Sequence, residues 1–185
     1  LVLDCGPLGE GNHGHLDCLS FELAANGRSL VVDPGRYTYS EAGAVNWRVR
    51  FRGTAAHSTV TVDGLNQTRY EPKRVAAGTR HATGSVRHRI AGPAPVARRH
   101  VLACEPGFRY VCASARRARY PAVHVRHVAF LFDEYWLVVD RLESPRRHTY
   151  DSRLQLGEHA DGACTWVESG GTRALWSPGL AIAFD

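Results

Sequence analysis

Short apolar runs separated by turn residues are the dominant pattern along this chain. Ser58–Val62 alternates polar and apolar residues and ends at Asp63-Gly64, a pair typical of tight turns. Leu19–Ala25 and Ser29–Val32 flank Asn26-Gly27, the dipeptide that most favours a two-residue hairpin turn. No segment keeps the apolar period of about 3.6 residues that an amphipathic helix needs, so the sequence predicts little helix.

Similar runs predict strands along almost the whole chain. Val123–Phe132 and Tyr135–Arg141 are joined by the short Asp133-Glu134 link and form a hairpin. Many short strands punctuated by Gly and Pro favour an all-β fold, an antiparallel β-sandwich or jelly-roll-like stack of sheets. The remaining predicted strands are Ala82–Arg89, His100–Cys104, Arg109–Ala115, His148–Leu156, Cys164–Glu168, Thr172–Trp176 and Leu180–Phe184.

The composition is that of one globular domain. With 185 residues, of which 44% are hydrophobic and 22% charged, the chain is long enough to bury a core and too apolar to be disordered. No apolar run approaches the ~20 residues that span a bilayer, so no membrane span is expected. The chain starts at Leu1 and contains no methionine. We therefore expect residues 1–185 to be a single domain of a longer protein.

Arginine supplies nearly all of the positive charge, since Lys73 is the only lysine and the formal net charge is +5. A guanidinium group pairs bidentately with carboxylate and sulfate-like groups, so the excess favours an anionic partner. Nucleic-acid binding would need basic and aromatic residues interleaved on one motif, and the sequence has no such motif. No nucleic-acid partner is therefore expected.

Candidate site residues are concentrated in the first third of the chain. His13 and His15 lie one residue apart, and Asp33 opens an Asp-Pro-Gly turn. His57 follows in another polar segment. Imidazole and carboxylate groups are ligand types suited to zinc, and a site with three ligands leaves a position for water or substrate. These residues therefore predict a metal site.

A shared site requires a bend before the first hairpin. If Asn26-Gly27 is a two-residue turn, Asp33 falls opposite Ser20. His15 then lies five residues before Ser20, which is about 17 Å away at ~3.3 Å per residue. The segment His13–Asp17 must therefore curl back, through a bulge or a glycine-assisted bend.

Four stretches carry recognisable motifs in a fixed order: Gly11–Leu23, Val31–Gly35, Arg52–Val60 and Tyr135–Leu142. They resemble, in that order, the motifs HGHxD, DPG, TAAHNT and the strand YWVVVDRL of the heparinase II/III family of polysaccharide lyases. The resemblance spans about residues 5–157. Two positions depart from the family pattern, Gly53 in place of Ser and Ser58 in place of Asn.

The resemblance implies an enzyme of two domains, in which an N-terminal helical toroid packs on a C-terminal β-sandwich and the cleft lies between them. This chain would be the β-sandwich alone. The implied reaction is β-elimination at a uronic acid. Cationic or hydrogen-bonding groups neutralise the C6 carboxylate, a base removes the C5 proton, and an acid, commonly Tyr, protonates the departing O4. Because the toroid supplies the other catalytic residues, the isolated domain is expected to be nearly inactive.

The resemblance also implies a role for each candidate residue. His13 matches the cleft histidine, which acts as base or carboxylate partner, and it is the predicted catalytic residue. The predicted ligands of a structural zinc ion are His15, Asp33 and His57. The predicted substrate contacts, which would clamp a carboxylate or bind sugar, are Asn12, Arg36, Tyr37 and Tyr39.

Two other functions compete with that of a lyase. A non-catalytic carbohydrate-binding or structural β-sandwich would show sugar affinity without a toroid partner. A cupin-type metal oxygenase also carries His-x-His, but Leu19 and Ser20 stand where its glutamate is usual, and Glu22 comes too late. An enzyme that degrades an anionic polysaccharide is expected to be periplasmic or secreted.

Overall fold

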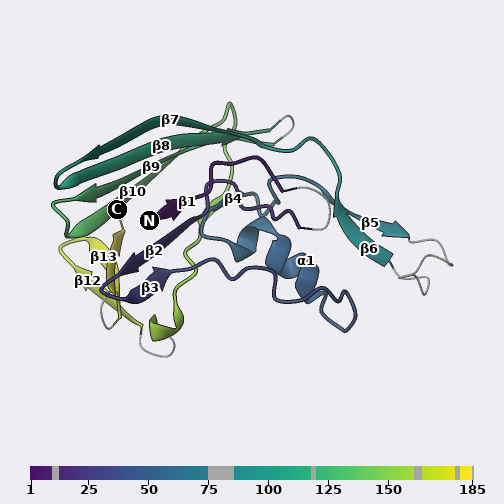
Figure 1. Cartoon of the computed structure of the whole chain (residues 1–185), viewed down its shortest axis with the longest axis horizontal. Coiled ribbons are helices and arrows are strands. Elements are labelled where there is room, and N and C mark those ends of the chain that lie inside the picture. Colours follow the sequence, from purple (N-terminus) through teal and green to yellow (C-terminus); the bar gives the residue numbers. More distant parts are fainter. Residues whose placement is uncertain (10–12, 75–85, 118–119, 161–163, 178–179, 185) are drawn as a thin grey trace.

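The computed structural model describes residues 1–9, 13–74, 86–117, 120–160, 164–177 and 180–184. Strands dominate these residues, and the pairings between them are antiparallel (Figure 1). The all-β class predicted from the sequence is confirmed. In chain order the strands are β1 (Val2–Leu3), β2 (Phe21–Ala25), β3 (Arg28–Val31), β4 (Val60–Val62), β5 (Tyr70–Arg74), β6 (Val86–Ile90), β7 (Val96–Glu105), β8 (Phe108–Arg116), β9 (Val123–Leu131), β10 (Tyr135–Glu143), β11 (Tyr150–Ser152), β12 (Thr165–Ser169), β13 (Thr172–Ser177) and β14 (Leu180–Phe184).

Two sheets pack face to face around the core. The first has the order β1-β2-β3 and the second the order β10-β9-β8-β7, and Figure 1 shows the four long strands lying over the three short ones. Phe21 and Leu30 of the first sheet pack against Trp136 and Val138 of the second. Apolar area buried between two sheets is the main favourable contribution to such a fold, about 25 cal/mol per Å².

The first hairpin has the predicted turn but not the predicted register. Asn26 and Gly27 have φ angles of 51° and 73°, as a two-residue turn with two left-handed positions requires. A bulge between Leu23 and Ala24 then shifts the register, so that Leu23 pairs with Val31. The pairing inferred from the turn alone is therefore wrong beyond the bulge, because turn chemistry carries no information about an inserted residue.

Helix is minor, as the sequence predicts, although the position of the short α-helix in the described residues was not predicted. α1 (Trp47–Arg52) begins at Asn46, whose side-chain oxygen accepts a hydrogen bond from the backbone N–H of Val49 (3.0 Å). The 3₁₀ helices η1 (Thr54–Ala56) and η2 (Glu158–Ala160) are shorter still. In the described part of the chain no helix is long and apolar enough to cross a membrane.

Other strand boundaries also differ from the prediction. β5 was not predicted, and its pairing with β6 forms a hairpin that extends beyond α1 in Figure 1. For the predicted strand Ala82–Arg89 the structure describes β6, while residues 82–85 lie outside the described residues. The predicted strand His148–Leu156 is reduced to β11, which pairs with the short β4.

Candidate metal centre

Asp33 and His57 are oriented by local turns. Asp33 follows β3, and its Oδ1 accepts a hydrogen bond from the backbone N–H of Gly35 (2.8 Å). Gly35 has a φ of 61°, a left-handed conformation that glycine adopts without strain. His57 ends η1, where its backbone N–H donates to the carbonyl of Thr54 (3.2 Å). Nδ1 of the fully buried His57 ring lies 2.6 Å from Asp33 Oδ2.

His15 reaches these residues because the chain before it curls back, as a shared site required. Arg52 of α1 is fully buried, and its Nε and Nη2 donate to the carbonyl of Gly14 at 2.8 and 2.6 Å. The backbone N–H of Leu16 in turn donates to the carbonyl of Arg52 (2.9 Å). A Cβ at Gly14 would overlap the carbonyl oxygen of Gly9. The bend therefore depends on a glycine and on an arginine from a distant segment.

A second turn completes the curl. Ser20 N–H donates to the Asp17 carbonyl (2.7 Å), and Leu19 takes a left-handed φ of 62°. Leu19 N–H then donates to the carbonyl of Asp4 (2.7 Å), whose own N–H donates to the Ser20 carbonyl (2.8 Å). The predicted strand from Leu19 therefore starts two residues later, at Phe21.

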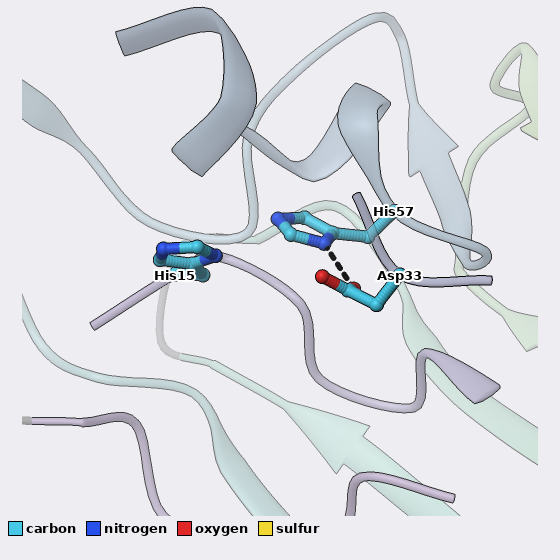
Figure 2. Close-up of side chains that lie close together, drawn as sticks. All are labelled: His15, Asp33 and His57. Atoms are coloured by element: carbon cyan, nitrogen blue, oxygen red, sulfur yellow. Dashed lines mark hydrogen bonds and ion pairs between the residues drawn. The ribbon is translucent and has the colours of Figure 1, made fainter. Parts of the chain in front are cut away.

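These bends bring the three predicted metal ligands together. One ligand atom each from His15, Asp33 and His57 can be chosen so that all three lie within 4.8 Å of one another. The imidazole rings of His15 and His57 have centroids 5.3 Å apart. Figure 2 shows both rings and the carboxylate turned toward a common point, although the residues come from three separate segments.

The surroundings of His15 and Asp33 favour their deprotonated side chains, which are the forms that bind a metal ion. Burial, and after it the nearby His57 and Arg52, lower the pKa of His15 to about 4. Burial alone would raise the pKa of Asp33, but the hydrogen bond and charge of His57 outweigh it and lower that pKa. At neutral pH the set therefore offers a neutral imidazole at His15 and a carboxylate at Asp33.

His13 lies beside this centre with part of the predicted substrate-binding set. It is exposed, and its Nδ1 is 3.4 Å from Nη1 of Arg36. The Arg36 guanidinium stacks on the ring of Tyr39, which lies edge-on to His13. Tyr37 instead contacts other aromatic residues, and Asn12 lies outside the described residues.

The family model described as Heparinase II/III-like, C-terminal, matches residues 1–183. The chain belongs to this family. A comparison with curated proteins gives no match.

Two solved structures share the fold of this heparinase II/III-like domain. The crystal structure of heparan sulfate lyase HepC from Pedobacter heparinus is 24% identical, with a TM-score of 0.64, and the match covers 94% of this chain and 24% of that chain. The crystal structure of heparinase III is 18% identical, with a TM-score of 0.60, and the match covers 88% of this chain and 22% of that one. The domain thus spans about a quarter of each.

The donor set of this heparinase II/III-like domain fits a zinc ion. Two imidazoles and one carboxylate are common zinc ligands, and ligand atoms of one zinc ion lie within about 4 Å of one another. The spacing of 4.8 Å among His15, Asp33 and His57 needs only a small closure to meet that limit. Nε2 of His57 is buried and has no hydrogen-bond partner among the described residues. Zinc binding itself stays a prediction.

Sequence reasoning missed the buried arginine that ties the centre to the second sheet. Arg126 of β9 is fully buried, and its Nη1 donates to the carbonyls of Leu19 and Ser58, both at 2.6 Å. Its Nε and Nη2 bind the two carboxylate oxygens of Asp140 at 2.7 and 2.8 Å. Burial would raise the pKa of Asp140, but the bonds from Arg126 and His124 hold it well below its usual range. The pair therefore fixes the residues next to the metal centre.

Proposed function

We propose that this domain is the zinc-holding half of a polysaccharide lyase that cleaves uronic-acid-containing polysaccharides by β-elimination. The observation that carries the proposal is the convergence of His15, Asp33 and His57 beside an exposed His13. Membership of the heparinase II/III-like family and a fold shared with heparan sulfate lyases support it.

In the proposed reaction a base takes the C5 proton of the uronic acid, the C4–O4 bond breaks, and a C4–C5 double bond forms. The departing O4 takes a proton from an acid. His13 acts as the base or as a partner of the C6 carboxylate, and Arg36, 3.4 Å from it, neutralises that carboxylate. Stabilising the negative charge that develops after loss of the C5 proton is the largest requirement. The remaining catalytic groups come from an N-terminal helical toroid of the same protein.

The proposed role of zinc is structural. When bound to His15, Asp33 and His57, the ion would join the curled segment, the Asp-Pro-Gly turn and the end of η1. Because a metal that binds only the folded state stabilises it, its binding energy becomes folding energy. His13 is two residues from His15, so a fixed His15 also limits the movement of His13.

The proposed substrate is a polysaccharide with carboxylate or sulfate groups, of the heparin, heparan sulfate or alginate type. The formal net charge of +5 comes from arginines, and a guanidinium binds both groups in a bidentate manner. Such polymers are found outside the cytoplasm, so we propose that the full-length protein is periplasmic or secreted.

The test uses the purified full-length protein that contains this domain. Its metal content is measured, and heparin, heparan sulfate and alginate are supplied in turn while the absorbance of unsaturated uronate is followed. We expect about one zinc per chain and product from at least one polymer. His13→Ala should remove product formation and keep the zinc, whereas His57→Ala should lose the zinc. Zinc and sugar binding without product would indicate a non-catalytic carbohydrate-binding domain, and absence of both zinc and product would refute the proposal.

A further inference from the structure

Three aromatic rings form a cluster at the surface that neither the metal centre nor His13 uses. Tyr37 stacks on Phe51, with ring centroids 5.0 Å apart and an angle of 17° between the ring planes. Trp47 lies 6.0 Å from Tyr37 and 6.1 Å from Phe51. Tyr37 is 71% exposed and Trp47 is 39% exposed, so solvent reaches both rings. We call Tyr37, Trp47 and Phe51 the aromatic cluster.

The segment that carries the aromatic cluster is fixed by buried polar contacts. The Glu41 carboxylate accepts hydrogen bonds from Arg48 Nη1 (3.3 Å) and from the backbone N–H of His88 (2.9 Å). Its Oε2 also lies 2.8 Å from Nδ1 of His88. These bonds join the loop before α1 to the helix and to β6. Tyr37 itself has a left-handed φ of 51°, an uncommon conformation for a bulky residue and one found at functional positions.

Positive charge surrounds the rings. The guanidinium of Arg50 lies over the Trp47 ring, 5.1 Å from its centroid, and that of Arg36 lies over Tyr39, 3.2 Å from its centroid. Of the four arginines within residues 34–52, Arg48 and Arg52 are buried, which leaves Arg36 and Arg50 to face solvent. The one acidic residue in this range, Glu41, is bound to Arg48 and His88. The surface therefore presents aromatic rings next to guanidinium groups.

From this geometry we propose that the aromatic cluster and Arg50 form a second sugar-binding subsite, which holds a non-reacting unit of an anionic polysaccharide next to the cleavage site. The inference rests on the proposed function and extends it. An aromatic face packs on the C–H groups of a sugar ring, while Arg50 pairs with its sulfate or carboxylate. Arg36 contacts His13 and directly precedes Tyr37, so the subsite adjoins the catalytic histidine. Contact with another domain is the competing use of such a surface.

The test compares Trp47→Ala with wild type in the full-length protein, on heparan sulfate chains and on a tetrasaccharide of the same polymer. We expect KM for the long chains to rise about tenfold, because the variant loses one contact between an aromatic ring and a sugar. The kcat value should not change on either substrate, because a subsite that holds a non-reacting unit contributes binding alone. Trp47→Phe should recover most of the affinity.

The chain offers a matched control in Trp166 of β12. It is 56% exposed, and the Arg173 guanidinium lies 5.1 Å from its ring centroid, so it repeats the Trp47–Arg50 arrangement elsewhere. Trp166→Ala should leave KM unchanged. If Trp47→Ala instead lowers kcat on both substrates and the melting temperature falls below that of Trp166→Ala, the cluster contacts another domain and the inference is wrong.

Failure of the proposed function gives a different result. If the wild type forms no product, binding of heparan sulfate is measured by calorimetry for the same variants. Loss of affinity in Trp47→Ala alone then supports the subsite although the lyase assignment fails. Equal binding by wild type and both variants, or absence of binding in all of them, would overturn the inference.

Discussion

Replacing Arg126 by methionine tests whether the buried arginine holds the metal centre and the second sheet together. Methionine keeps an unbranched apolar stem but removes the guanidinium group and with it every donor. The Asp140 carboxylate then loses its bidentate partner, and the carbonyls of Leu19 and Ser58 lose theirs. The cation–π contact of Arg126 with Phe21, at 4.9 Å, is lost as well.

The expected loss is large because the partners stay buried. Removing one member of a buried ion pair costs about 3–5 kcal/mol, and an orphaned buried carbonyl costs about 1–3 kcal/mol. Two features reduce the effect. Asp140 keeps the hydrogen bond from Nε2 of His124 (2.8 Å), and its side chain is 14% exposed. We therefore expect Arg126→Met to lower the free energy of unfolding by about 3–4 kcal/mol.

Urea denaturation followed by circular dichroism measures this loss. Arg141→Met is the control, because the Arg141–Glu143 pair is largely exposed and such pairs contribute about 0–1 kcal/mol. The double variant Arg126→Met with Asp140→Leu should recover much of the loss, since it leaves no buried carboxylate without a partner. A loss below about 1 kcal/mol for Arg126→Met, or strict additivity in the double variant, would refute the reasoning.

Three further predictions concern the metal centre and pH. Gly14→Ala should weaken zinc binding at least about tenfold, because the new Cβ overlaps the Gly9 carbonyl. The control Gly6→Ala should leave zinc binding unchanged, because its Cβ meets only an ordinary contact at 3.4 Å. Chelation should lower the free energy of unfolding by ~2.7 kcal/mol relative to protein in zinc at about 100 times Kd, and Asp33→Asn should abolish that difference in a melting assay. Burial lowers the pKa of His124 despite its bond to Asp140, so the unfolded chain binds more protons than the folded one. The free energy of unfolding should therefore fall as the pH drops below 6.5. Urea denaturation repeated across pH should show a shallower fall for His124→Gln.

Local signals predicted much of the fold. Asn26 and Gly27 determine a tight turn through their own backbone preferences, and the alternation in Ser58–Val62 marks a strand, β4, that begins at Val60. The bulge at Leu23 and α1 escaped prediction for different reasons. The bulge has no residue signature, whereas α1 is too short to show a helical period, although Asn46 is a recognisable cap.

The sequence indicated the candidate site and the need for a bend before it, but not the contacts that form the bend. Histidine and aspartate types, together with the family motifs, point to His15, Asp33 and His57. The bend that unites them depends on Arg52 binding Gly14 across 38 positions of sequence. Contacts between segments so distant leave no local pattern. Trp47 and Phe51, four residues apart on one face of α1, were a signal that could have been read.

The two buried arginines explain why a site built from loops can still be ordered. Arg52 binds the chain just before His15, and Arg126 binds it at Leu19 and also binds Ser58, next to His57. Each guanidinium donates to carbonyl oxygens of irregular segments, so these backbone groups are paired although they lie outside the strands. Loops that carry binding residues need such rigid support. It follows that the positions of the candidate metal ligands His15, Asp33 and His57 are determined largely by the surrounding fold, and that the proposed zinc ion would close a site which the protein has already assembled.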